Sequence, residues 1–495
     1  MSLENNHLRL VLCQGDQTTI RIGDPVFRTN AWLQTKVGYY LLGSVVSPLG
    51  TVLNEEDYRP ADLAFQAITF GGYVRMFPDI PTIIQRASVT RPFLTGVTVI
   101  DSFIPIGCGQ RELIIGDHNS GKTSLALTAI LNQHRIVNGY YKVWRSFEDS
   151  IQAKDRAGIT YTPCIFVAIG KKRSEIVRIK RVLLSHGAFN YTSIVFTSSD
   201  DLVALQYLAP YSGCTMAEFF RDRGMHSVVV YDDLSNHAVA FRQISLLLRR
   251  PPGREAYPGD IFYIHARLLE RAAQLTKRLG GGSVTALPIV ETKGGDVSGY
   301  IPTNIISITD GQIFLSMSLA NKGILPAIDI TQSVSRVGSK AQYNAMKDIM
   351  KKVKRDYALY RNYEAFSKIG NGVDGAIKGY VTRGLQYMFL FKQRLYETHT
   401  FYRQVISLFA VSNGYLESVD LANIQFFFSI FFSGNFADQY LSNKEHIIYF
   451  VEDETLESLL IINSLECIES DLHEIFKEYQ HFFITEVQPR LVNQQ

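Results

Sequence analysis

The chain has few cysteines, little net charge and no apolar tract long enough to cross a bilayer. Its five cysteines are odd in number, lie far apart and form no Cys-x-x-Cys pair, which indicates free thiols in a reducing compartment and not a disulfide framework. A net charge of +3 with 20% charged residues gives no strong field for nucleic acid or for a membrane surface. The most apolar tract, residues 424–432, is far shorter than the roughly 20 residues that span a bilayer. We therefore expect any membrane association to come through partner proteins.

The sequence also lacks a recognisable leader segment, an internal repeat and a low-complexity linker. What it has is 495 residues with 46% hydrophobic content, enough for the cores of two or three domains. Residues 1–90 contain short β segments with Gly-, Pro- and Asp-rich turns, residues 91–375 alternate strand-like with helical runs, and residues 376–495 are helical. This order predicts an α/β fold with a mostly parallel sheet covered by helices. The strands predicted in the central part are 112–115, 164–169, 192–197, 227–231 and 304–308, and segment 446–464 is predicted to be a helix.

The most specific motif is the octapeptide GDHNSGKT, which fits the phosphate-binding pattern G-x-x-x-x-G-K-[ST]. An apolar run precedes it and a helix-like stretch follows it, which is the strand–loop–helix context that the motif requires. The two glycines let backbone N–H groups point at phosphate oxygens, the lysine brings charge to the outer phosphates, and the threonine hydroxyl is a ligand for Mg²⁺. The sequence therefore predicts a cradle for nucleotide phosphates, made by Gly116, Asp117, His118, Asn119, Ser120, Gly121, Lys122 and Thr123.

A carboxylate for the same Mg²⁺ follows a second apolar run. The β-branched stretch 227–231 reads as a buried parallel strand, and Asp232 is the first acid after it. We predict that Asp232 holds the metal, directly or through its bound water, while Asp233 caps the next helix. The alternative is that both acids only cap that helix.

Several further stretches carry a family resemblance. They are residues 105–107, 111–117, 209–214, 246–260 and 333–339. Together they closely resemble the alpha subunits of F-type ATP synthases over roughly residues 18–400. The resemblance implies a partial N-terminal β-barrel at 1–90, a P-loop (RecA-like) nucleotide-binding domain at 91–375 and a C-terminal α-helical bundle at 376–495.

The resemblance also implies partners and roles. Three such subunits would alternate with three beta subunits in a ring around a rotating gamma subunit, with a peripheral stalk and no nucleic acid. The alpha subunit would hold ATP or ADP with Mg²⁺ but leave turnover to beta. Arg336 resembles the arginine that alpha inserts into the neighbouring beta site, and loop 249–260 resembles the bearing around gamma. Gln393 resembles one of two glutamines beside the adenine.

Position 171 argues against catalysis by this chain itself. Hydrolysis requires a carboxylate that orients the attacking water, and catalytic relatives carry a glutamate just after the strand that follows the cradle helix. This chain has Lys171 there, where alpha subunits have glutamine. A lysine can add charge near bound phosphate, but an ammonium cannot accept the proton of water at neutral pH. We therefore expect no ATPase activity from the isolated chain.

Other positions depart from the alpha pattern. His118, Asn119 and Ser120 stand where these subunits usually have Arg-Gln-Thr, Leu325 replaces an arginine beside the nucleotide, and Leu395 replaces the second glutamine. Each change removes a polar contact, so we expect weaker binding, with Mg-ATP still bound.

Two segments depart from the family in length. Residues 142–160 look inserted, as a longer loop or as a contact for a lineage-specific partner. The N-terminal region looks short, with the match starting near residue 15. Because open barrel edges are a liability, we expect a further polypeptide to complete the barrel.

Three alternatives remain at this point: a hexameric P-loop translocase for nucleic acid, a vacuolar-type regulatory subunit and a stand-alone ATPase. A translocase would need a basic or aromatic platform for single strands, and residues 1–90 show none. The 30 phenylalanines and 26 tyrosines suit an AT-rich organelle genome. We therefore expect the matrix side of the mitochondrial inner membrane, with the plastid thylakoid and the bacterial plasma membrane as alternatives.

Overall fold

The protein is described here from a computed structural model. The structure describes residues 2–4, 7–9, 21, 23–25, 27, 30–53, 71–133, 162–367, 375–432 and 469–484. The apparent insertion at 142–160 and the predicted helix at 446–464 lie outside these residues. No helix in the described ranges is both long and apolar enough to cross a membrane.

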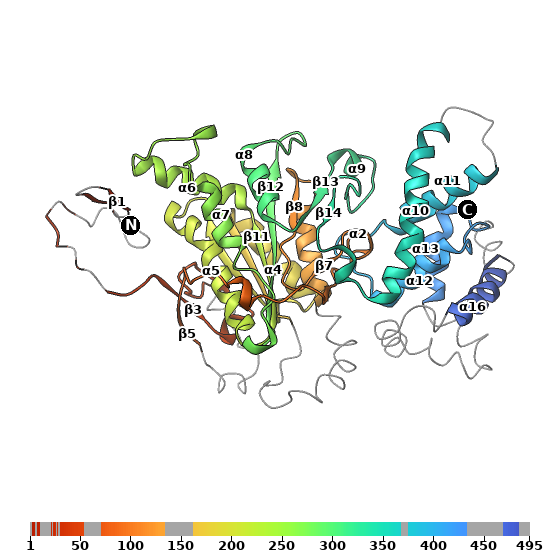
Figure 1. Cartoon of the computed structure of the whole chain (residues 1–495), viewed down its shortest axis with the longest axis horizontal. Helices are drawn as coiled ribbons and strands as arrows, with labels where there is room; N and C mark the ends of the chain where they lie inside the picture. Colours follow the sequence, from red (N-terminus) through yellow and green to blue (C-terminus); the bar gives the residue numbers. More distant parts are fainter. Residues whose placement is uncertain are drawn as a thin grey trace.

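The centre of the molecule is an eight-stranded sheet in the order β14-β13-β8-β12-β11-β9-β10-β4 (Figure 1). All neighbouring strands are parallel except β14, which runs antiparallel to β13 at one edge. The bounds are β4 Val45–Val46, β8 Leu113–Asp117, β9 Cys164–Lys171, β10 Thr192–Ser198, β11 His226–Asp232, β12 Ser283–Thr292, β13 Gly311–Leu315 and β14 Val334–Ser335. The α/β fold with a parallel-sheet core is thus confirmed.

Helices cover both faces of this sheet, so its strands are apolar on both sides. Alternate residues of a strand enter different cores: Phe166 belongs to one hydrophobic cluster and Val167 to the other. One face packs against α2, α4 and the helix that starts at residue 122, and the opposite face packs against α5 to α8. The bounds are α2 Thr98–Phe103, α4 Arg173–Ser185, α5 Val203–Arg221, α6 Leu234–Leu247, α7 Ile261–Leu269, α8 Tyr300–Ile308 and α9 Met317–Asn321. The 3₁₀ turns are η2 Tyr39–Leu41, η4 Ile83–Gln85, η5 Phe189–Tyr191, η6 Arg254–Ala256, η7 Lys277–Leu279, η8 Gly338–Ala341 and η9 Leu421–Asn423.

The strand predicted at 304–308 is wrong, because this segment is the last part of α8. Ile301, Ile305 and Ile308 are all buried, and their spacing of four and three residues places them on one helical face. Pro302 lies in the first turn, where its missing N–H breaks no helical hydrogen bond. The four other predicted strands correspond to β8, β9, β10 and β11, whereas β12 and β13 were not predicted.

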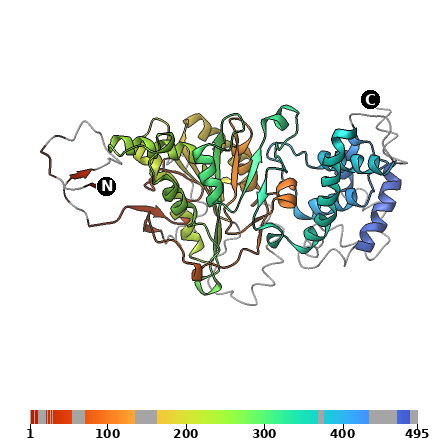
Figure 2. The same cartoon turned by 45° about the horizontal axis from the view of Figure 1, so that its top comes forward.

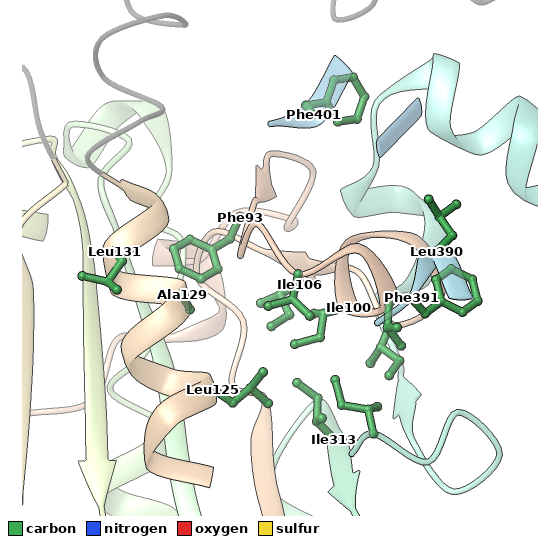
Figure 3. Close-up of a cluster of buried hydrophobic side chains, with 14 of the residues drawn as sticks. Phe93, Ile100, Ile106, Leu125, Ala129, Leu131, Ile313, Leu390, Phe391 and Phe401 are labelled. Carbon is green, nitrogen blue, oxygen red and sulfur yellow. The ribbon is translucent and has the colours of Figure 1, made fainter. Parts of the chain in front are cut away.

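The C-terminal region is helical, with α10 Asn344–Ser367, α11 Gly375–Leu390, α12 Phe401–Ser412, α13 Ile424–Phe431 and α16 Glu469–Phe482. Figures 1 and 2 both show these helices, coloured cyan to blue, at one end of an elongated molecule. They share one hydrophobic cluster with the sheet. Figure 3 shows Ile100 of α2 between Leu125 of the helix after β8 and Phe391 of the C-terminal region.

The described residues near the N-terminus form small antiparallel pairs. These are β1 (Ser2–Glu4) with β2 (His7–Arg9), β3 (Gln34–Val37) with β5 (Gly72–Arg75), and β6 (Pro92–Phe93) with β7 (Ile106–Gly107). Residues 54–70 lie outside the described ranges, so the partial barrel stays a prediction.

The shared cluster gives the first testable expectation. Ile100 is 2% exposed, and its replacement by alanine should lower the free energy of unfolding by about 2–5 kcal/mol because a cavity remains between sheet and C-terminal helices. Urea unfolding of the full chain would measure this loss. Ile84→Ala is the matched control, since Ile84 is 89% exposed and its loss should change stability by less than about 0.5 kcal/mol. Equal stability of both variants would contradict the shared core.

Candidate nucleotide-binding site

The phosphate loop connects the end of β8 to the helix that begins at Lys122. Gly116 has to be a glycine, because a Cβ there would lie 2.6 Å from the carbonyl oxygen of Leu315 on β13. Gly121 has a φ of +97°, a left-handed conformation that side chains disfavour. The loop thus turns sharply while it is pressed against the neighbouring strand, and the helix N-terminus that follows it is a favourable place for phosphate.

Lys122 folds back over this loop. Its Nζ donates to the carbonyl oxygens of Gly116 at 3.0 Å and Asp117 at 2.5 Å, and the residue is 8% exposed. Burial lowers the pKa of Lys122, while Glu291, Asp233 and Asp232 partly oppose that shift. Next to it, the buried hydroxyl of Ser120 has no hydrogen-bond partner among the described residues. An ammonium and an unpaired hydroxyl in one loop fit the oxygens of a phosphate group.

Thr123 and Asp232 meet as the sequence predicted. Asp232 ends β11, and the hydroxyl of Thr123 donates to its Oδ2 at 2.7 Å. A hydroxyl and a carboxylate are oxygen donors of the kind that Mg²⁺ prefers, but the carboxylate is also paired with the ammonium of Lys171. Parallel strands bring Thr123 and Asp232 together, because β8 and β11 end at the same edge of the sheet.

Lys171 reaches the same carboxylate from the end of β9. Its Nζ lies 3.0 Å from Oδ1 of Asp232 and 3.3 Å from Oδ2 of Asp233. Burial would lower the pKa of Lys171, but the two carboxylates outweigh it and raise that pKa above its usual value. Burial also raises the pKa of Asp233 to about 6, although Lys171 opposes this. Asp233 caps α6 by accepting the backbone N–H of Asn236 at 2.7 Å.

The rim of the loop is tied to the end of β12. Asp117 accepts hydrogen bonds from the hydroxyl of Thr292 and the backbone N–H of Gly295, both at 2.7 Å. His118, which is 76% exposed, lies 2.9 Å from Oε1 of Glu291. Asn119 adopts a φ of +59° at the tip. Sequence reasoning missed Glu291 and Thr292 because it did not identify β12, although the apolar run 284–290 was a usable signal.

Gln393 lies beside Leu325, as its backbone N–H donates to the Leu325 carbonyl at 2.9 Å. Its side-chain amide is engaged with the start of α2: Oε1 accepts the N–H of Thr98 at 2.8 Å and Nε2 donates to Gly96 at 3.0 Å. Leu325 and Leu395 expose about half of their surface. Gln393 and Leu325, both at positions expected beside the nucleotide, are thus neighbours, but the Gln393 amide already has protein partners.

Arg336 lies far from this loop. It directly follows β14, which pairs with the amino end of β13, whereas the loop follows the carboxyl end of β8. The five residues of β8 separate the two ends by about 13 Å. The exposed guanidinium donates to the carbonyl oxygens of Thr309 at 3.1 Å and Ile306 at 3.4 Å, at the end of α8. Arg336 therefore faces away from the chain's own cradle.

Loop 249–260 projects between α6 and α7 with its tip exposed. Arg249, Glu255 and Ala256 have positive φ angles, which indicates a tightly turned path. Glu255 accepts the N–H of Tyr300 at 3.2 Å, and the guanidinium of Arg254 lies over the Tyr300 ring. The start of α8 thus supports an ordered, exposed loop.

Comparisons with known proteins cover most of the chain. Residues 96–335 match the ATP synthase alpha/beta family, nucleotide-binding domain, and residues 342–455 match the ATP synthase alpha/beta chain, C terminal domain. The ATP synthase subunit alpha of Neorickettsia sennetsu is 48% identical over 423 residues, which are 86% of this chain and 78% of that protein. The subunit alpha of Orientia tsutsugamushi (strain Ikeda) is 45% identical over 97% of this chain and 86% of its own length. The subunit alpha of Rickettsia canadensis is 45% identical over 92% of this chain and 83% of its own length. The similarity thus extends beyond residues 18–400, and these relatives are bacterial.

The geometry of the loop predicts that Lys122 dominates phosphate binding. Lys122→Ala should weaken the affinity of the full chain for ATP by about 10- to 100-fold, since a charge-assisted hydrogen bond is lost. Equilibrium titration with a fluorescent ATP analogue measures this change. Lys277→Ala removes an exposed lysine of η7, which precedes the amino end of β12 at the opposite end of the sheet, and should leave affinity unchanged. Unchanged affinity in Lys122→Ala would exclude this loop as the phosphate site.

Proposed function

The chain belongs to the ATP synthase alpha/beta family as an alpha subunit of the F-type enzyme, and on that premise we propose that it serves the catalytic head in two ways. It holds ATP or ADP in its own cradle without turning it over, and it donates Arg336 to the catalytic site of a neighbouring beta subunit. The first role stabilises the head, and the second supports ATP synthesis coupled to ion transport.

The observation that carries the second role is the position of Arg336. It is exposed, about one strand length from its own cradle, and its guanidinium donates to carbonyl oxygens at the end of α8. A planar guanidinium can make two parallel hydrogen bonds to phosphate oxygens as negative charge builds up in the transition state. A phosphate within its reach would belong to a neighbouring subunit.

The charge arrangement at the end of β9 supports the first role. A water that attacks the terminal phosphate needs a carboxylate to orient it and accept its proton. Lys171 stands at this place, and it is paired with Asp232 and Asp233. The carboxylate of Glu291 at the rim is paired with His118. The cradle can therefore hold a nucleotide but has no free base at the end of β9.

Other parts of the site would complete nucleotide binding. Thr123 and Asp232 are the oxygen donors that Mg²⁺ would need, and the ammonium of Lys171 already neutralises the Asp232 carboxylate. A contact between Gln393 and the adenine stays a prediction, because the amide would have to exchange its bonds to Thr98 and Gly96. The short side chains of His118 and Asn119 leave the outer face of the phosphates open.

We infer the partners from the family and from the exposed loop at 249–260. Loop 249–260 would contact the rotating gamma subunit, since its tip is ordered and exposed. A peripheral stalk remains part of the proposal. The chain acts in a membrane-associated complex, and we place that complex on the matrix side of the mitochondrial inner membrane. Bacterial relatives leave the bacterial plasma membrane as the competing location.

Arg336→Lys in the assembled complex tests the donated arginine. Assembly should be intact, while ATP hydrolysis and synthesis should fall by about 10³-fold, because lysine keeps the charge but not the planar fork. Steady-state turnover of the purified complex is the measurement. Arg278→Lys, at an exposed arginine of η7, should turn over normally. Normal turnover in Arg336→Lys would remove the proposed role.

The isolated full chain provides a second test. It should bind ATP and show no multiple turnover. Sustained hydrolysis that Lys122→Ala abolishes would show that the chain is itself a catalyst.

A further inference from the structure

The strongest unexplained feature of the cradle is the partly buried cation at its base. The side chain of Lys171 is only 20% exposed and reaches from β9 to two carboxylates on the neighbouring β11 edge. Those of Asp232 and Asp233 are 2% and 5% exposed. An ammonium at 3.0 and 3.3 Å from two buried carboxylates is held firmly, because separating them would leave uncompensated buried charge.

Each oxygen of the Asp232 carboxylate, the group that Mg²⁺ would need, already has a partner. Oδ1 of Asp232 faces Lys171, and Oδ2 accepts the hydroxyl proton of Thr123 at 2.7 Å. Thr123, Asp232, Lys171 and Asp233 therefore form one continuous polar chain. An Mg²⁺ ion would have to approach a carboxylate that is already neutralised, with an ammonium on its other side.

The charges around the loop suit a phosphate that arrives without metal. Lys122 in the loop and Lys171 at the end of β9 both bring an ammonium group to this end of the sheet, so an anion bound there meets positive charge without a metal ion. The loop N–H groups and the N-terminus of the following helix add further positive potential.

We propose that Lys171 is a resident cation that replaces Mg²⁺ at Asp232, so that this cradle takes nucleoside di- and triphosphates in their metal-free form. The inference rests on the proposed nucleotide role. Mg²⁺ gives up its bound water reluctantly. An ammonium that belongs to a side chain fills the site without that dehydration. Lys171 thus makes occupancy of the site insensitive to the free Mg²⁺ concentration.

The test compares ATP binding with and without the metal. A fluorescent trinitrophenyl-ATP is titrated into the full-length chain in excess Mg²⁺ and in EDTA, and the ratio of the two Kd values is the readout. For the wild type, the Kd values in Mg²⁺ and in EDTA should agree within about threefold. Lys171→Gln should restore dependence on Mg²⁺, with binding at least about tenfold tighter when the metal is present, because Asp232 is then free for the ion.

Two variants complete the design. Lys172→Gln removes an exposed lysine next in sequence and should keep the wild-type ratio. Lys171→Arg keeps the positive charge and should also keep the wild-type ratio of the two Kd values. The wild-type ratio is decisive even if Lys171→Gln fails to fold.

The outcomes separate this inference from the proposed function. A wild-type chain that binds at least about tenfold tighter with Mg²⁺ would overturn the resident-cation role and leave the nucleotide role intact. A folded Lys171→Gln variant with an unchanged ratio would do the same. No binding in either medium would overturn the nucleotide role, and this inference with it.

Discussion

The buried carboxylate of Asp232 is the group on which the arrangement of the site depends. It accepts the hydroxyl of Thr123 from the helix after β8 and pairs with Lys171 from β9, so one side chain of β11 joins the ends of three strands. A carboxylate 2% exposed is stable only with such partners. The same requirement ties the helix that follows the phosphate loop to the end of β11.

The direction of the strands divides the molecule into two functional ends. Because β8, β9 and β11 are parallel, their carboxyl ends gather the cradle at one edge, and the antiparallel β14 carries Arg336 to the other end. The proposed function uses both ends, with the chain's own nucleotide at one end and the site of a neighbouring subunit at the other. The shared cluster around Ile100 packs this sheet against the C-terminal helices.

Several features were readable without coordinates, and others were not. The motif from Gly116 to Thr123 identified the loop, and the apolar run before Asp232 identified a buried strand. The strand predicted at 304–308 failed because isoleucines spaced for one face of a helix were read as a β run. Glu291 was missed with β12, since nothing local linked it to the cradle. The contact of Gln393 with an adenine stays a prediction, while the bonds of its amide to Thr98 and Gly96, nearly 300 positions earlier, could not be read from the sequence.

By itself the sequence determined the phosphate loop, the parallel α/β core and the family, because these depend on local motifs and on runs of apolar residues. Only the tertiary structure decided that Lys171 pairs with Asp232 and Asp233, since these carboxylates lie about 60 residues away in sequence and meet it through strand order. It alone also placed Arg336 at the far end of β8 from its own cradle. The physical reason is that charge pairing acts over a few ångströms in space, and the chain sets those distances only once the sheet has formed.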